Sequence, residues 1–560
     1  MKGAPMLKNI SHFLLPVLFL LLPCFSFAEE PIPATIDPAC GAMEFEAGEI
    51  IVKFREGIPQ ASVQSLFLAE EVSILDEMEN LGLMLLSVPR GQELEKVEEL
   101  KRNPLVEYAE PNYVVQVVNT IVAEPHYSLS APDVEPNDPR YPGDSGQWNL
   151  RKIEAPAAWD ITTGSDRVII AFVDSGVDLE HPELKDKIWT NPDEIPGNGI
   201  DDDGNGYVDD VHGWDFVNWD NEPQDDYWHG TFISSISAAE TNNGIGMAGV
   251  SWGAEIMPIK VIDNLGKSYH WHTAGGITYA ADNGAKIINL SWTLTGSDYP
   301  QPLQTAVNYA HSKGALVVAA AGDSSDSSYK YPASLDHVVS VAATGRDNGH
   351  PDFSTYNDKV DIAAPGRDIL GLCLGGVYCR FSSTHSAAPH VSGLAALIWS
   401  VNPHLSPDYV ESIIESTAVD LGESGWDEKF GHGRIDASAA VRATPHYLEV
   451  EPDDGLSFLV CDDCDPPSRK ITNPNTSCST WSTTAEVDWL SISPCEGYMP
   501  SWVTVSIDKG GLQGYGLHTA PITATSTMSN HVNNPLTIPI TVTYASQCWR
   551  NYLPLLFKES

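Results

Sequence analysis

Short, uninterrupted runs of β-branched and other apolar residues constrain the fold of this chain more than any other feature. The clearest runs cover residues 168–173, 285–290 and 315–320, and stretches with helical periodicity lie between them. Strands that are apolar on both faces are typical of a parallel sheet covered by helices on both sides. The sequence therefore predicts an α/β domain, with a parallel sheet flanked by helices, over residues 148–443.

The segments on either side of this domain differ from it in composition and in the periodicity of their apolar residues. Residues 29–117 combine alternating strands with two helical patterns, which predicts a small α+β domain. Residues 118–147 lose this periodicity and gain Pro, Asp and Ser, as linkers do. Alternating segments rich in Ser, Thr and Pro predict an all-β sandwich over residues 446–545, with a short tail over residues 546–560.

The start of the chain has the pattern of an export signal. Lys2 and Lys8 make it positive, residues 13–22 are apolar, and Ala28 provides a small residue at its end. This pattern predicts a secretory signal peptide over residues 1–28, and therefore a protein that is secreted or held at the cell surface. No later stretch is apolar for long enough to span a bilayer.

The charge balance restricts the partners of the chain. With 31 Lys and Arg against 76 Asp and Glu, the net charge is −45. Such a chain repels phosphate backbones and anionic bilayers, so we expect no nucleic acid and no membrane surface as partners. An acidic surface suits hard cations such as calcium, and we expect no organic cofactor. Export also permits disulfides; Cys373 and Cys379 are candidates, with the pairing left open.

One acidic loop resembles the start of a calcium-binding loop. Oxygen-bearing side chains alternate along it, and Gly206 follows where such a loop turns sharply. His212 stands where the twelfth position usually holds Glu, so another carboxylate must complete the site. A solvated acidic loop without a cation is the alternative. The expected calcium ligands are Asp201, Asp203, Asn205, Tyr207, Asp209 and Asp210.

Three motifs fall where an α/β sheet presents the carboxyl ends of its strands, which is where such sheets bind ligands. They cover residues 173–178, 229–231 and 384–391. Together they resemble the motifs of the subtilisin-like serine proteases. The resemblance implies that Asp174 orients an imidazole and that His229 is the general base that activates a nucleophile.

The resemblance extends to both flanking domains. Residues 29–117 resemble the inhibitory propeptide of secreted members of the family, which implies that this propeptide binds its own protease domain. Residues 446–545 resemble a BACON-type β-sandwich, which implies a surface glycan or a protein as a partner. The substrate that the family implies is a polypeptide bound in extended form.

The nucleophile motif departs from the family pattern. Aligned on the Ala-Ala-Pro-His-Val that follows, the position of the nucleophilic serine holds His385, and Ser386 stands one place later. A shift of one residue in a helix turns a side chain by about 100° and moves it by about 1.5 Å. Asp323 stands where the family has the Asn that donates a hydrogen bond to the oxyanion. An ionised carboxylate cannot donate one, whereas a protonated carboxyl group could, so this change alone does not abolish catalysis.

The substrate-binding segments are the third departure. The resemblance places Ser291, Trp292 and Thr293 on one side of the cleft, where the family has glycines shortly after the serine. Thr293 and the next residue, Leu294, are therefore expected to crowd a peptide backbone. The segment before Asp323 is expected to form the other side of the cleft, with Ala320, Ala321 and Gly322.

Three functions follow from these departures. The first is a family member with lost or impaired catalysis that binds extended peptides. The second is an active serine endopeptidase that uses Asp174, His229 and a displaced Ser386. The third is a pocket converted to bind zinc or iron through Asp174, His229, Asp323 and His385.

Overall fold

The computed structural model describes residues 44–545, with gaps at 56, 71, 117–134, 143–145, 295–298, 446–455, 462–467, 474–479, 486, 494–495, 499–500, 515 and 527–535. The predicted signal peptide, most of the predicted linker and the predicted tail lie outside these residues. Within the described ranges, no helix has both the length and the apolar composition needed to cross a membrane.

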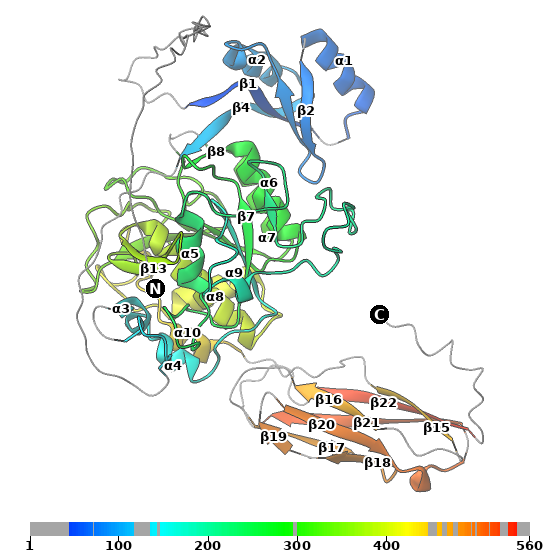
Figure 1. The fold of residues 1–560 in the computed structure, drawn as a ribbon. Helices are drawn as coiled ribbons and strands as arrows, with labels where there is room; N and C mark the ends of the chain where they lie inside the picture. Colours follow the sequence, from blue (N-terminus) through cyan, green and yellow to red (C-terminus); the bar gives the residue numbers. More distant parts are fainter. Residues whose placement is uncertain are drawn as a thin grey trace, which may run out of the picture. The chain divides into compact units, whose positions relative to one another are not determined.

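A seven-stranded sheet with the order β12-β11-β10-β9-β5-β7-β6 forms the centre of the α/β domain (Figure 1). Its neighbouring strands all pair in parallel, as the apolar runs predict. The strands are β5 (Ile169–Asp174), β6 (Trp214–Asp215), β7 (Glu255–Lys260), β9 (Ile287–Leu290), β10 (Leu316–Ala320), β11 (Val338–Thr344) and β12 (Ile362–Pro365).

Helices cover both faces of this sheet because successive side chains of each strand point to opposite sides. In β5, Ile170 and Phe172 belong to one buried cluster, and Ala171 and Val173 belong to another. The first cluster includes α5 and α8, and the second includes α6 and α7. The helices are α3 (Trp148–Lys152), α4 (Ala155–Trp159), α5 (His229–Ala238), α6 (His270–Asp282), α7 (Gln301–Ser312), α8 (Ala388–Val401), α9 (Pro407–Ser416) and α10 (Ala437–Ala443).

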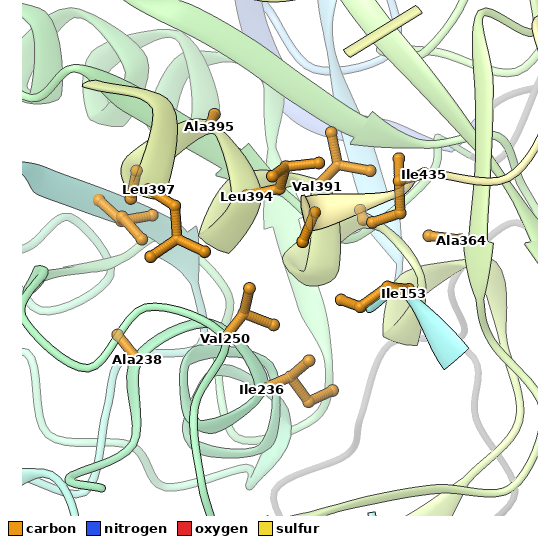
Figure 2. Packing of buried hydrophobic residues seen from close by; sticks show 14 of the residues in the cluster. Ile153, Ile236, Ala238, Val250, Ala364, Val391, Leu394, Ala395, Leu397 and Ile435 are labelled. Carbon is orange, nitrogen blue, oxygen red and sulfur yellow. The ribbon is translucent and has the colours of Figure 1, made fainter. Parts of the chain in front are cut away.

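Helix α8 is the centre of the first cluster. All fourteen of its residues are buried, which explains why its sequence is apolar on every side. Figure 2 shows Val391 and Leu394 of α8 in the same cluster as Ile236 of α5 and Val250 of the loop that follows it. Because α5 begins with His229 and α8 directly follows residues 384–386, this packing fixes the two catalytic motifs relative to each other.

The segment before this domain forms a small α+β fold, as predicted. Its strands join an antiparallel sheet in the order β2-β3-β1-β4-β8, in which β8 (Lys267–Tyr269) belongs to the α/β domain. Helices α1 and α2 contribute residues to its buried cluster. The elements are β1 (Phe45–Phe54), α1 (Gln60–Glu70), β2 (Ser73–Met78), β3 (Leu83–Ser87), α2 (Glu93–Lys101) and β4 (Val106–Gln116).

The C-terminal region is all-β. Its two sheets have the orders β15-β22-β21-β17-β19 and β16-β20-β18, around a core that includes Trp489 and Val505. The strands are β15 (Leu456–Cys461), β16 (Ser468–Asn473), β17 (Thr480–Ala485), β18 (Leu490–Ser493), β19 (Glu496–Tyr498), β20 (Ser501–Ile507), β21 (Gly516–Ser526) and β22 (Leu536–Ala545). The predicted fold class is therefore confirmed.

A disulfide links Cys373 to Cys379, two of the candidate cysteines. It closes the hairpin formed by β13 (Ile369–Cys373) and β14 (Val377–Phe381). The hairpin precedes the short turn that carries residues 384–386, so the disulfide stiffens the approach to the nucleophile motif.

Candidate active site

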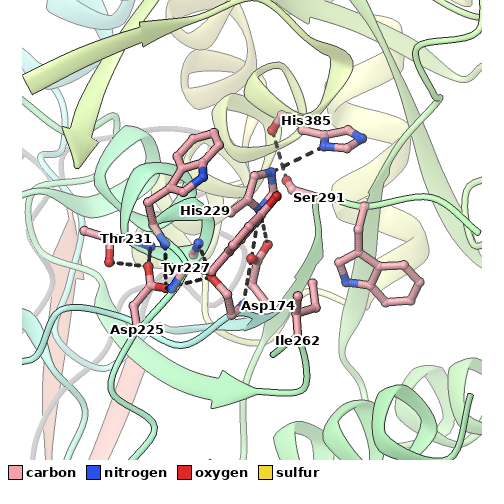
Figure 3. Close-up of polar contacts among 12 residues, drawn as sticks. Asp174, Asp225, Tyr227, His229, Thr231, Ile262, Ser291 and His385 are labelled. Carbon is pink, nitrogen blue, oxygen red and sulfur yellow. Dashed lines mark hydrogen bonds and ion pairs between the residues drawn. The ribbon is translucent and has the colours of Figure 1, made fainter. Parts of the chain in front are cut away.

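Asp174 and His229 form the buried acid–base pair that the sequence predicts. Asp174 is the last residue of β5, and His229 is the first residue of α5. The Nδ1 atom of His229 lies 2.8 and 3.0 Å from the two carboxylate oxygens of Asp174 (Figure 3). Because a carboxylate only accepts hydrogen bonds, Nδ1 carries the proton. The other ring nitrogen, Nε2, is the atom with which a general base in this position accepts a proton.

Asp225 holds the segment that presents His229. Its carboxylate accepts hydrogen bonds from the backbone N–H groups of Tyr227, Trp228 and Thr231 and from the hydroxyls of Ser175 and Thr231 (Figure 3). Burial raises the pKa of Asp225, and these hydrogen bonds lower it. The sequence analysis missed this residue, because a lone Asp four positions before a histidine is not a motif.

His385 contacts the side of the His229 ring that faces away from Asp174. It lies in the one-turn helix Thr384–Ser386, just before α8, and only 3% of it is exposed. Its Nδ1 atom lies 3.3 Å from Nε2 of His229, with the two rings nearly perpendicular at 89°. Burial, assisted by the neighbouring His229, lowers the pKa of His385 to about 4. His385 is therefore neutral at pH 7, and its N–H faces the atom that would remove the proton of a nucleophile.

Ser386 is not brought to His229. Its side-chain oxygen is buried and has no hydrogen-bond partner among the described residues. Its backbone carbonyl accepts a hydrogen bond of 2.9 Å from Nδ1 of His390, whose Nε2 lies 2.7 Å from the side-chain amide of Asn149. These contacts fix the backbone of the turn that carries Ser386, one residue beyond the position that faces His229.

Asp323 faces the nucleophile motif as an acceptor. It follows β10 by three residues, and its carboxylate accepts hydrogen bonds from the backbone N–H of Thr384 at 2.8 Å and from the Thr384 hydroxyl at 2.9 Å. The hydroxyl of Ser383 donates a further hydrogen bond to it. Three donors thus converge on the position where the family pattern has a donor for the oxyanion.

The four residues of the proposed zinc or iron pocket do not form a ligand cluster. Asp174 is occupied by His229, and Asp323 is occupied by Thr384 and Ser383. In the described ranges, no three of these four side chains bring ligand atoms within 4.8 Å of one another.

The segment 291–294 pairs with the end of β4 at Leu294, although it lacks the glycines of the family. Val115, near the end of β4, forms an antiparallel bridge with Leu294. The predicted crowding is therefore wrong at Leu294, whereas no contact tests it at Thr293. The reason is that Leu294 turns its side chain inward, with 5% exposed, and leaves its backbone for pairing.

On the opposite side, the same end of β4 pairs with β8. Val114, Val115 and Gln116 stand opposite Tyr269, Ser268 and Lys267. The prodomain-like segment thus ends as a strand held between β8 and Leu294. This strand shows that the cleft accommodates a polypeptide in extended form.

The other predicted cleft residues take different positions. The Ser291 hydroxyl donates a hydrogen bond of 3.0 Å to the carbonyl of His385, which ties this segment to the nucleophile motif. Trp292 is fully buried, and its indole N–H donates to the carbonyl of Val173, so only its backbone is available to a peptide. Ala320 and Ala321 are buried, and the Gly322 N–H donates to the Thr384 hydroxyl at 3.0 Å.

The acidic loop brings two of the carboxylates predicted to bind calcium together with a third carboxylate. Asp203 and Asp210 lie with Glu194, and ligand atoms of the three are within 4.8 Å of one another. One carboxylate oxygen of Glu194 is buried without a hydrogen-bond partner in the described ranges. Burial raises the pKa of Asp210, as expected for a carboxylate that lacks a counter-charge. A calcium ion fits this donor set, which consists of oxygen atoms only.

The other four predicted ligands serve the loop itself. Asp201 accepts hydrogen bonds from the backbone N–H groups of Gly204, Asn205 and Gly206, and Asp209 accepts from those of residues 198 and 199. The Asn205 amide donates to both Asp203 and Asp210, and Tyr207 packs against Trp214. Glu194 was missed because it lies outside the loop motif.

Comparisons with known proteins agree with this geometry. The Subtilase family matches residues 165–433, and the Fervidolysin N-terminal prodomain matches residues 33–112. Thermitase of Thermoactinomyces vulgaris is 40% identical over 307 residues, which cover 55% of this chain and 99% of the relative. A thermophilic serine proteinase of Bacillus sp. strain AK1 is 35% identical over 395 residues, covering 70% of this chain and 87% of the relative.

A third relative, a halolysin-like extracellular serine protease of Natrialba magadii, is 30% identical over 406 residues. This alignment covers 71% of the chain and 68% of the relative. The acid–base pair, the parallel sheet and these relatives together show that the chain belongs to the subtilase family and carries a fervidolysin-like prodomain.

Proposed function

We propose that this protein is an exported subtilase that retains the scaffold and prodomain of its family but does not hydrolyse peptides through a serine nucleophile. The observation that carries the proposal is the contact of 3.3 Å between Nδ1 of His385 and Nε2 of His229. In a working triad, this position of the base faces a hydroxyl.

The chemistry of acyl transfer requires that hydroxyl. The base removes its proton while the oxygen attacks the carbonyl carbon, and reacting atoms must approach to about 3 Å. The N–H of a neutral imidazole at position 385 occupies the lone pair of His229 instead. Removal of the nucleophile from such a triad lowers kcat by about 10⁶-fold. The remaining Asp174–His229 pair has no partner to activate.

Asp323 supports the same conclusion through the second catalytic element. Donors aimed at the developing oxyanion contribute about 10²–10³-fold each to kcat. An ionised carboxylate repels that charge, and the side-chain oxygens of Asp323 already accept three hydrogen bonds from Ser383 and Thr384. The oxyanion position therefore opposes the reaction.

The retained function that we propose is the binding of polypeptide in extended form. The strand β4 supplies the support, since Val115 pairs with both Ser268 and Leu294. Because a chain without peptidase activity cannot remove its own propeptide, residues 29–117 stay attached unless another protease cuts the linker. The prodomain is then the resident occupant of the cleft.

Three accessory features belong to the same proposal. The segment 1–28 has the pattern of an export signal, so we propose a secreted or cell-surface protein. We propose a structural calcium ion at Glu194, Asp203 and Asp210, supported by the buried Glu194 oxygen that lacks a partner in the described ranges. The C-terminal β-sandwich is proposed to be BACON-like and to bind a surface glycan or a protein.

The test combines processing and active-site labelling of the secreted protein. We expect N-terminal analysis to find the chain starting near residue 29, and a fluorophosphonate probe to leave it unlabelled while labelling thermitase. Peptide hydrolysis by the wild-type protein that disappears in His229→Ala would refute the proposal. A fluorophosphonate adduct on Ser386 would refute it equally, because it would identify a displaced nucleophile.

A further inference from the structure

A cluster of two histidines and one aspartate lies on the α/β domain, outside the acid–base pair and the acidic loop. His311 is in the last turn of α7, His337 directly precedes β11, and Asp408 is in the first turn of α9. Nε2 of His311 lies 2.6 Å from a carboxylate oxygen of Asp408. One ligand atom of each of the three side chains lies within 4.8 Å of the others.

The two imidazoles are held face to face. Their ring centroids are 4.0 Å apart and their planes differ by 21°. The backbone of His337 has φ +63°, a left-handed conformation that is costly for a residue other than glycine. The Nε2 atom of His311 donates a hydrogen bond to Asp408, so it must release its proton to bind an ion, and the two rings must turn out of their stack for their in-plane lone pairs to converge. Neutral imidazole is the form that binds metal ions.

We propose that His311, His337 and Asp408 bind a transition metal ion of the zinc class, with water as the remaining ligand. Two imidazole nitrogens and a carboxylate oxygen are a ligand set of zinc and of its first-row neighbours, whereas calcium prefers oxygen alone. The net charge of −45 favours a cation at any such site.

The geometry requires the three side chains to rearrange, and the two rings to leave their stacked arrangement. At zinc–ligand bond lengths of about 2.1 Å, neighbouring ligand atoms of a tetrahedral site are about 3.4 Å apart. The 2.6 Å contact between His311 and Asp408 must therefore open, and the side chain of Asp408, which is 71% exposed, has room to move. The ion would join α7, the turn before β11, and α9. Binding would thus stabilise the folded domain, whether or not the protein is a protease.

The experiment uses the full secreted chain after removal of metals, with calcium kept present to occupy the acidic loop. Calorimetric titration with Zn²⁺ is expected to give one site, and zinc is expected to raise the Tm. The double variant His311→Ala/His337→Ala should weaken zinc binding by at least about 100-fold and abolish the Tm shift. Asp408→Asn should weaken it to a lesser degree.

Matched variants locate the ion. His432→Ala removes a histidine that is 43% exposed, and Asp336→Asn removes the carboxylate next to His337; both should bind zinc like the wild type. The circular dichroism spectrum of the double variant reports whether it is folded. Absence of zinc binding by the wild-type protein would overturn the proposal. Unchanged binding by the folded double variant, or loss of binding in His385→Ala instead, would overturn it too.

Discussion

Replacement of His385 by serine should restore peptide hydrolysis, because the Asp174–His229 pair is still in place. In the structure, Asp174 already orients His229 at 2.8 Å, and Nε2 of His229 points at position 385. His385→Ser removes the imidazole from this space and introduces a hydroxyl on the correct turn of the chain. We expect the variant to cleave its own linker and to react with a fluorophosphonate, whereas His385→Ala does neither.

The size of the recovered activity depends on Asp323. Both donors of Thr384 reach the same carboxylate oxygen of Asp323, and the Ser383 hydroxyl reaches the other. In Asp323→Asn, the carbonyl can keep the two hydrogen bonds from Thr384 while the amide replaces the second oxygen. The amide is then a donor for the oxyanion. We expect the double variant His385→Ser/Asp323→Asn to exceed His385→Ser by about 10²-fold in kcat, or about 3 kcal/mol.

The assay is hydrolysis of a chromogenic peptide, with intact mass to follow removal of the prodomain. The control is the double variant that also carries His229→Ala, which should be inactive. If the folded double variant neither reacts with the probe nor cleaves peptide, position 385 is not what prevents catalysis. The argument from the contact of His229 with His385 would then be wrong.

Three further outcomes are expected. Because the pKa of His385 falls from 6.5 to about 4 on folding, only the unfolded chain gains its proton between these values. The wild type should thus lose about 3 kcal/mol of stability relative to His385→Ser as the pH falls from 7 to 4, measured by urea unfolding. In a chain that also carries His311→Ala/His337→Ala, so that the proposed zinc site is absent, a chelator should lower the Tm of the parent and of the control variant Glu180→Gln, but not that of Glu194→Gln. Cys373→Ser opens a loop whose ends are 6 residues apart and should cost about 2 kcal/mol in the same unfolding assay, with reductant removing the difference.

The sequence was sufficient for the features that repeat along the chain or stand in a motif. The apolar runs at 168–173 and 315–320 correspond to β5 (Ile169–Asp174) and β10 (Leu316–Ala320), because burial on both faces leaves a clear pattern. The pair Asp174 and His229 was also predicted, since each stands in a specific motif at the end or start of an element.

Features that depend on the backbone or on distant segments were not predictable in this way. The pairing of Val115 with Leu294 uses main-chain atoms, so the side chains suggested crowding where the structure has a bridge. Glu194 joins Asp203 and Asp210 from another turn of the chain, which spacing within one loop cannot reveal. Trp292 was predicted to line the cleft because it stands between two predicted cleft residues in the sequence. In the structure its side chain is buried in the domain.

Any free peptide that binds the cleft must compete with the strand β4, which is covalently attached to the same chain. A segment that is covalently joined to the domain it binds has an effective local concentration in the millimolar range. If that segment binds its groove with a dissociation constant in the micromolar range, the apparent affinity of a free peptide falls by about a thousandfold. Cleavage anywhere in residues 118–134 would let the displaced segment diffuse away. A single cut by another protease would therefore make the peptide-binding cleft accessible to free peptides.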